Sequence, residues 1–244
     1  VARDTVFQRH LQCDIDGEVR RLFLEELTPP AMTPAPALAQ TGEVPAIATP
    51  GDLAEWPRLS PHELDWFADC QGRERSRGRE RLRHYRYRWI AKRSGGRRLL
   101  EAPKPRLKQL QRAVLQEILN QIARHAAPHA FRPGRSVATF ARPHSGQRIV
   151  LRIDLRNFFP SVQRSRVFRL FQTIGYPEAV ARLLCGLCTN SAPEEVLRED
   201  QDDQGEAMIL RWRGLYESPH LPQGAPTSPA FANLAAWRLD SRLW

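Results

Sequence analysis

The chain has 244 residues, of which 41% are apolar and 26% charged, which is enough apolar material for one large domain with a buried core. No stretch approaches the roughly 20 consecutive apolar residues of a membrane helix, and the opening VARDTVFQRH lacks the apolar segment of a signal peptide, so we expect a cytoplasmic protein with no membrane partner. The net charge of +10 is concentrated in residues 73–112, which hold 16 Lys and Arg against 3 Asp and Glu.

Aromatic residues are interleaved with the arginines of this basic block, at Tyr85, Tyr87 and Trp89. Arginines that neutralise phosphates beside rings that stack on bases suit a polyanionic partner such as nucleic acid. For residues 73–83 a second interpretation stays open, a solvated Arg-rich helix or linker whose two glutamates pair with neighbouring arginines.

The N-terminal part of the chain divides by composition. Residues 1–27 alternate charge and leucine and predict a helical extension, whereas residues 28–51 contain six prolines and one charge and predict a linker or extended arm. The capping-box pattern SPHE at residues 60–63 predicts the start of a short helix. We therefore expect the folded unit to begin near Asp52.

Four segments in the middle of the chain have periodic patterns. Residues 85–103 alternate apolar and basic side chains on either side of an SGG turn and predict a hairpin. Residues 106–125 space leucine, isoleucine and valine at helical intervals, and residues 167–190 predict two helices broken at Gly-Tyr-Pro. Residues 149–155 alternate Ile, Leu, Ile and Leu with other residues and predict a strand.

Near the C-terminal end, residues 191–214 predict an acidic, solvent-facing loop that leads into a short strand, and residues 221–234 predict a rigid loop that runs into an apolar helix. Four cysteines are too few for a disulfide framework. We expect Cys185 and Cys188, a C-x-x-C in an apolar helical pattern, to be buried thiols, with metal or redox use as the alternative.

Two motifs carry polar groups suited to chemistry. Asp154 stands at the end of the predicted strand, where a carboxylate can hold a divalent cation, although an Asp that caps the following turn would look similar. Gln223 and Gly224 lie in LPQGAPTSP, where exposed backbone beside an amide can meet a flat ligand closely. The alternative for this loop is a turn and helix cap.

These motifs resemble a known family. DLRNFFPSV and LPQGAPTSP, in which Gln223 follows Asp154 by 69 residues, are similar to the palm motifs of reverse transcriptases. KRSGGRRLLEAPKPRLKQLQRAVLQEIL and HAFRPGRSVATFARPHSGQ resemble fingers motifs of the bacterial, retron-type branch, although Phe140 replaces the Asn of the N-A-x-x-H box and Ala130 replaces a usual Gly.

The resemblance covers residues 52–244 and implies an α+β right-hand fold. Residues 52–147 would form the fingers and N-terminal helices, and residues 148–244 a partial palm that precedes the family's Tyr-x-Asp-Asp motif, which this sequence does not contain. With one of three catalytic carboxylates, the chain is expected to be an N-terminal portion that does not polymerise alone.

The resemblance also implies residue roles. Asp154 would be the catalytic, metal-binding carboxylate, the carbonyl of Leu155 a further metal ligand, and Phe159 the aromatic gate that excludes a ribonucleotide 2′-hydroxyl. The expected contacts to the incoming nucleotide are Lys92, Arg98, Phe159, Pro222, Gln223 and Gly224. The expected contacts to nucleic acid are Arg86, Arg88, Arg135 and His144.

The implied activity is RNA-directed DNA synthesis with two Mg²⁺ ions, deoxynucleotides, nascent DNA and a structured non-coding RNA as template and primer. Retron enzymes serve in phage defence with an effector protein, which would be a further partner. The alternatives are a reverse transcriptase of a group II intron, a diversity-generating element or another defence system, and an RNA-binding module without catalysis.

Overall fold

The computed structural model describes residues 30–33, 43–76, 80–92, 96–132, 134–198 and 214–243. The chain divides into two units, residues 1–30 and residues 31–244, and the architecture that follows is that of the second unit. The helical extension predicted for residues 1–27 lies outside the described residues.

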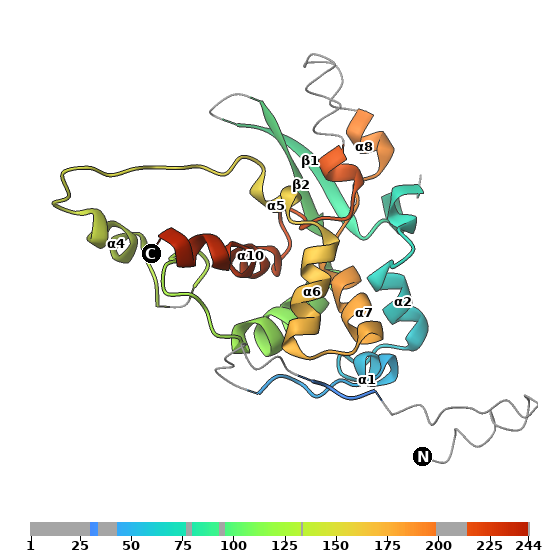
Figure 1. Ribbon diagram of the computed structural model, residues 1–244. Coiled ribbons are helices and arrows are strands. Elements are labelled where there is room, and N and C mark those ends of the chain that lie inside the picture. The colour runs from blue at the N-terminus through green and yellow to red at the C-terminus, as the bar shows by residue number, and fades with distance from the viewer. Residues whose placement is uncertain are drawn as a thin grey trace, which may run out of the picture. The chain divides into compact units, whose positions relative to one another are not determined.

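Helices and one hairpin make up the described part of the chain (Figure 1). The α-helices are α1 (Pro50–Glu55), α2 (Pro61–Ala68), α3 (Pro105–Ala113), α4 (Val137–Ala141), α5 (Phe158–Ser161), α6 (Arg164–Ile174), α7 (Glu178–Cys188), α8 (Glu194–Arg198) and α10 (Ser228–Leu243). The tighter or wider helical turns are η2 (Arg73–Ser76), η3 (Glu80–Leu82), η4 (Val114–Ile118), η5 (Leu119–Gln121) and η6 (Arg142–His144). Strands β1 (Tyr85–Ala91) and β2 (Arg97–Pro103) pair antiparallel, so the α+β class is confirmed.

The predicted capping box starts α2. The Glu63 amide donates to the Ser60 hydroxyl at 3.2 Å, and the Glu63 carboxylate accepts from the Ser60 amide at 2.9 Å, which satisfies two otherwise unpaired donors. Packed structure begins before the expected Asp52, because Ile47 is 2% exposed and the Tyr176 hydroxyl donates to the carbonyl of Pro45. Part of the predicted linker is thus built into the fold.

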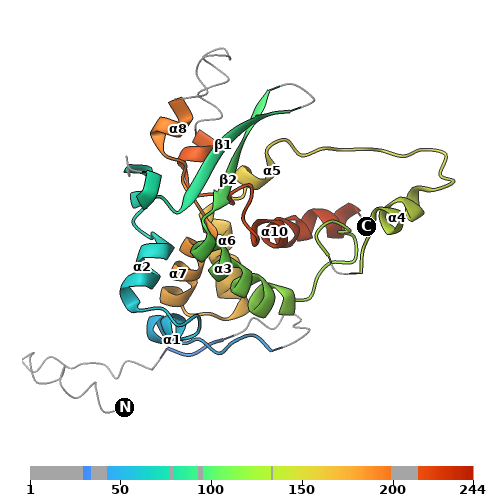
Figure 2. The same ribbon diagram turned by 180° about the vertical axis from the view of Figure 1, so that it is seen from behind.

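The core lies among α1, α2, α3, α6 and α7, which gather in both views (Figures 1 and 2). The Phe171 ring of α6 meets the Phe231 ring of α10 edge-on, with centroids 5.3 Å apart. Gly186 of α7 lies directly against the Ala68 carbonyl of α2, so a Cβ there would overlap backbone. The predicted break between α6 and α7 is confirmed, and Gly175 supplies it with φ of 116°.

The hairpin is also confirmed, with Tyr85 opposite Pro103 and Ala91 opposite Arg97. Its inward face packs on a second apolar cluster that includes Leu99 and Tyr216. The Trp89 indole donates to the Val196 carbonyl of α8 at 2.9 Å, which ties the hairpin to that helix.

The helix predicted for residues 106–125 forms as α3, continues in the π-helical turn η4 and ends in η5 at Gln121. Most of its periodic apolar positions are buried, including Leu107, Val114 and Ile118, whereas Leu115 is half-buried. The helical spacing of the sequence therefore gave the correct buried face.

The strand predicted for residues 149–155 is wrong. These residues have no strand structure, and Ile149 is 87% and Leu151 81% exposed. A strand requires a hydrogen-bonded neighbour, and the described residues offer none to this segment. The loop predicted for residues 191–214 is helical in part, as α8, and its predicted strand lies outside the described residues.

Cys185 and Cys188 are buried in α7, as the apolar helical pattern predicts. Burial raises the pKa of the Cys185 thiol to about 12 and also raises the pKa of Cys188. Both are therefore thiols rather than thiolates near neutral pH. Among the described helices, none combines the length and apolar character needed to cross a bilayer.

Candidate functional site

One face of the β1–β2 hairpin is basic. Arg86 and Arg88 of β1 and Arg98 of β2 are exposed on the same face, because side chains alternate along a strand and opposite residues share a face. Arg97 lies on the other face, with its guanidinium 5.7 Å from the centre of the Trp89 ring. The hairpin therefore presents three exposed guanidinium groups on one side and is anchored on the other.

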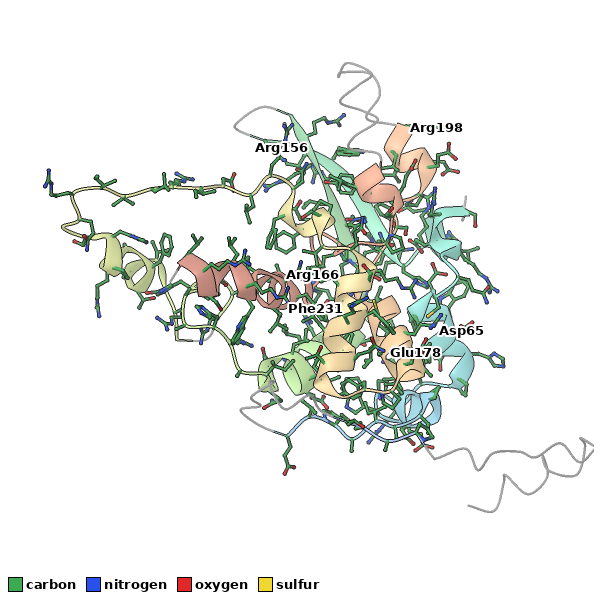
Figure 3. The ribbon with its side chains drawn as sticks, in the orientation of Figure 1. Asp65, Arg156, Arg166, Glu178, Arg198 and Phe231 are labelled. Atoms are coloured by element: carbon green, nitrogen blue, oxygen red, sulfur yellow. The ribbon has the colours of Figure 1, made fainter. Side chains whose placement is uncertain are left out.

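The end of β1 meets the segment that carries Asp154. The Lys92 ammonium donates to the side-chain oxygen of Asn157 at 3.2 Å. Burial is the main cause that lowers the pKa of Lys92, and the nearby Arg156 and Arg98 lower it further, whereas Asp154 opposes them. These charges therefore lie within electrostatic reach of one another, and Figure 3 shows Arg156 beside the hairpin. Lys92, Arg98 and Arg156 thus form a basic cluster near one carboxylate, that of Asp154.

Asp154 is exposed and Leu155 is 46% exposed, in the extended segment that leads into α5. Asn157 starts α5 in the left-handed conformation, with φ of 55°, which turns the chain sharply after Asp154. Phe159 follows within α5 and is half-buried against the main core. The motif thus places an exposed carboxylate five residues before an anchored aromatic ring.

The Gln223 loop, residues 221–227, is held between α5 and β2. The Leu221 amide donates to the Val162 carbonyl at 3.1 Å, and the Glu101 amide of β2 donates to the Gln223 carbonyl at 2.9 Å. Pro222 is buried, and its carbonyl accepts from the Ser228 hydroxyl at 2.7 Å. Backbone bonds therefore fix this loop against the strand that carries the basic face.

Gly224 has φ of 135°, and a Cβ at this position would lie 3.0 Å from the Glu101 carbonyl oxygen. The loop thus needs glycine here for its backbone conformation and for its close approach to β2. This contact is a physical reason for the Gly of the PQG sequence that is independent of any ligand.

The structure brings together most of the predicted site residues, but not Arg135 and His144. These two residues are exposed beside α4 and in η6, on a segment that Figure 1 shows running out from the body of the second unit. The ring of His144 packs edge-on against Phe140, with centroids 5.3 Å apart, and the guanidinium Nη2 of Arg135 donates to the Ala126 carbonyl at 3.5 Å. Their nucleic-acid contacts remain a prediction.

Sequence reasoning missed three residues of this site, namely Arg156, Asn157 and Glu101. Arg156 and Asn157 stand inside the quoted DLRNFF motif, so their proximity to Asp154 was available as a signal. Glu101 is fully buried although it belongs to the basic block. It lies two residues after the buried Leu99 on β2, so both side chains are on the same face, and this spacing was the signal for its burial.

The described residues do not form a complete divalent-metal site. They contain no group of three or more His, Cys, Asp or Glu side chains placed to hold an ion. Mg²⁺ takes an octahedral set of oxygen ligands, usually with one or two carboxylates. Asp154 alone, beside Lys92 and Arg156, supplies one carboxylate and no more.

A basic hairpin thus contacts both the segment that carries Asp154 and a loop that is fixed by backbone bonds. Residues 90–243 match the reverse transcriptase (RNA-dependent DNA polymerase) family, and the chain belongs to that family. It is 44% identical to the retron Mx65 reverse transcriptase of Myxococcus xanthus, over 68% of this chain and 37% of the relative.

Two further relatives are of the same type, which confirms the retron-type resemblance. The chain is 38% identical to the retron Mx162 reverse transcriptase of Myxococcus xanthus, over 78% of this chain and 36% of the relative. It is 32% identical to the retron Ec86 reverse transcriptase of Escherichia coli, over 60% of this chain and 37% of the relative. The chain thus spans a little over a third of the length of these relatives.

Proposed function

We propose that the protein is a retron-type RNA-directed DNA polymerase, and that this chain supplies its fingers and the nucleotide-facing part of its palm. The observation that carries the proposal is the double attachment of one hairpin. Lys92 at one end of the hairpin bonds to Asn157 next to the Asp154 segment, and Glu101 on its second strand bonds to the Gln223 loop. A ligand bound beside the hairpin would therefore contact both the Asp154 segment and the Gln223 loop.

In this proposal Lys92, Arg98 and Arg156 neutralise the triphosphate of an incoming deoxynucleotide, because phosphoryl groups in transfer are stabilised chiefly by positioned positive charge. Phe159 faces the sugar and excludes a 2′-hydroxyl, and Gln223 with its flanking backbone contacts the base pair. Asp154 contributes one ligand to a site for divalent cations, for which Mg²⁺ is the expected ion.

The template in this proposal is a structured RNA, held mainly through its backbone by the basic face with Arg86 and Arg88. Retron reverse transcriptases are the relatives that the chain matches, so a cognate non-coding RNA, an effector protein and a role in phage defence are the partners and process we propose. Arg135 and His144 would contact nucleic acid on a separate segment.

The test is DNA synthesis by the full-length protein on a structured RNA with Mg²⁺ and deoxynucleotides. Asp154→Asn is expected to abolish synthesis while RNA affinity stays within about twofold, because a neutral amide is a poor ligand for a hard cation. Asp65→Asn is the matched control, since Asp65 is an exposed carboxylate of α2. Synthesis by the Asp154 variant at the control rate would remove Asp154 from the reaction.

A second pair of variants tests the sugar gate. Phe159→Ala is expected to raise ribonucleotide incorporation relative to deoxynucleotide incorporation by about tenfold or more, since a 2′-hydroxyl then meets space rather than a ring. Phe158→Ala truncates the neighbouring half-buried ring and controls for general loosening of α5. Equal selectivity in both variants would show that Phe159 is not the gate.

An RNA-binding module without catalysis is the second candidate, favoured by the single carboxylate that the described residues place at the site. It predicts RNA binding that weakens steeply with salt, because Lys and Arg contacts release counterions. It also predicts no synthesis by the full-length protein under any nucleotide or metal condition.

A further inference from the structure

A fully buried polar junction lies directly behind the nucleotide-facing residues. Glu101 and His220 both have 0% exposure, and the His220 Nε2 is 2.9 Å from one carboxylate oxygen of Glu101. The other carboxylate oxygen accepts from the Asn190 amide at 2.8 Å, and the same Asn190 amide donates to the Tyr87 hydroxyl at 3.1 Å. Four side chains from β1, β2 and two later segments thus form one network, in which Asn190 and His220 contact the Glu101 carboxylate and Tyr87 contacts Asn190.

Backbone bonds extend this junction into the Gln223 loop. Asn190 and His220 exchange two amide-to-carbonyl bonds of 3.0 Å, and the Glu101 amide donates to the Gln223 carbonyl at 2.9 Å. The Gln223 amide in turn lies 3.4 Å from the Glu101 carboxylate. Glu101 therefore contacts the loop through its backbone and its side chain, three residues after Arg98 on the same strand.

The hydrogen bonds constrain the protonation of the pair. The Nδ1 of His220 lies 2.7 Å from the Ser218 carbonyl, which can only accept, so Nδ1 carries a proton. Nε2 faces the Glu101 carboxylate, which places a second proton between the two groups. A buried pair of this kind loses hydration and is weak support for stability by itself, so a role in fixing geometry is the better physical reason for it.

We propose that Glu101 and His220 are a positioning pair that holds the Gln223 loop at a set distance from β2, the strand that carries Arg98. The loop and Arg98 can then contact the same nucleotide. The inference rests on the proposed function and deepens it. Neither residue touches the nucleotide: Glu101 faces inward from β2, whereas Arg98 faces outward. Loss of the pair therefore loosens the loop and weakens nucleotide binding, and leaves the chemical groups in place.

Two disruptive variants and one conservative variant test the proposal in the full-length protein. Glu101→Ala and His220→Ala remove either partner, and His220→Ala decides the question if Glu101→Ala does not fold. Glu101→Gln keeps an oxygen for Asn190 and an amide that can donate to a neutral His220, but it replaces the oxygen that accepts from the Gln223 amide. Glu178→Gln is the control, because Glu178 is an exposed carboxylate of α7 that pairs with Arg182 at 2.6 Å.

Two measurements are made on each variant. The first is the KM for deoxynucleotide and the kcat of DNA synthesis, and the second is hydrogen exchange of the Gln223 amide in the folded protein. Both alanine variants are expected to raise KM about tenfold, the effect of one hydrogen bond to a charged group, with kcat within about twofold. They are also expected to speed exchange at Gln223, whereas the control resembles the unaltered protein. Glu101→Gln, which keeps the contacts to Asn190 and His220 and loses only the contact to the Gln223 amide, is expected to fall between the alanine variants and the unaltered protein.

Unchanged exchange at Gln223 in His220→Ala overturns the inference, whatever the polymerase result. A lower melting temperature with unchanged KM also overturns it, since the pair would then be structural only. Absence of DNA synthesis by the unaltered protein refutes the proposed function instead, and the exchange result alone then decides whether the pair positions the loop.

Discussion

Substitution of Gly224 by alanine tests how closely the Gln223 loop lies against β2. The added Cβ would lie 3.0 Å from the carbonyl oxygen of Glu101, 3.3 Å from its carbonyl carbon and 3.5 Å from the Cα of Ala102. All three are backbone atoms, so no side chain can rotate away. The backbone φ of 135° is a further cost, because L-residues rarely adopt it.

The magnitude follows from these two costs. Backbone strain at such a φ costs about 1–3 kcal/mol, and a tight contact with backbone costs about 1–3 kcal/mol. Because movement of the loop relieves part of each, we expect Gly224→Ala to lower the free energy of unfolding by about 2–4 kcal/mol. The displaced loop should also raise the KM for deoxynucleotide.

Urea unfolding of the variant, followed by circular dichroism, measures the loss, with Gly51→Ala as the control. A Cβ at Gly51 would lie 3.5 Å from the Thr49 hydroxyl oxygen, an ordinary contact, and alanine is favoured over glycine in a helix such as α1 by about 1 kcal/mol. The control should therefore be as stable as the unaltered protein or slightly more stable. Equal stability of Gly224→Ala and the unaltered protein, with equal KM, would refute the close approach of the loop to β2.

Three other predictions concern packing and protonation. Gly186→Ala places a Cβ against the backbone carbonyl of Ala68 and should destabilise the protein by about 2–4 kcal/mol in denaturant unfolding; a wild-type midpoint would contradict the contact between α7 and α2. Burial lowers the pKa of His220, but the buried carboxylate beside it raises the pKa more, so the net pKa is raised. The resulting stabilisation is complete below the ordinary histidine pKa of about 6.5 and is lost as pH rises through the raised pKa, which unfolding measured from pH 6 to 9 should detect and a flat profile would exclude. The raised pKa of about 12 at Cys185 predicts slow alkylation at pH 8 compared with the half-buried Cys70, and equal rates in the native protein would argue against its burial.

Local signals in the sequence were sufficient for most of the described fold. The capping box at Ser60, the Gly175 break and the hairpin each depend on residues close together in the chain, so a short window contains the whole cause. For residues 149–155 the local pattern gave the wrong secondary structure. Their alternation is typical of a strand, but a strand also needs a partner, and the described residues supply none.

The parts of the candidate site that could be predicted from the sequence are those that lie within the quoted motifs. The motif resemblance grouped Lys92 and Arg98 with Asp154, and the structure places Arg98 and Asp154 within electrostatic reach of Lys92, although more than 50 residues separate them from Asp154 in the sequence. Glu101 could not be found in this way, because its partners Asn190 and His220 are 89 and 119 residues distant. The position of Glu101 two residues after Leu99 indicates an inward side chain, but only the tertiary structure shows which groups this acid contacts.

The two sides of the site are fixed to different degrees. The Gln223 loop is held by backbone bonds to β2 and by the buried pair behind it, so its geometry is set before any ligand binds. Asp154 instead follows an exposed apolar segment whose backbone lacks a strand neighbour among the described residues, and the Lys92–Asn157 bond is its nearest anchor. The carboxylate that we propose as a metal ligand is therefore fixed by fewer described bonds than the Gln223 loop.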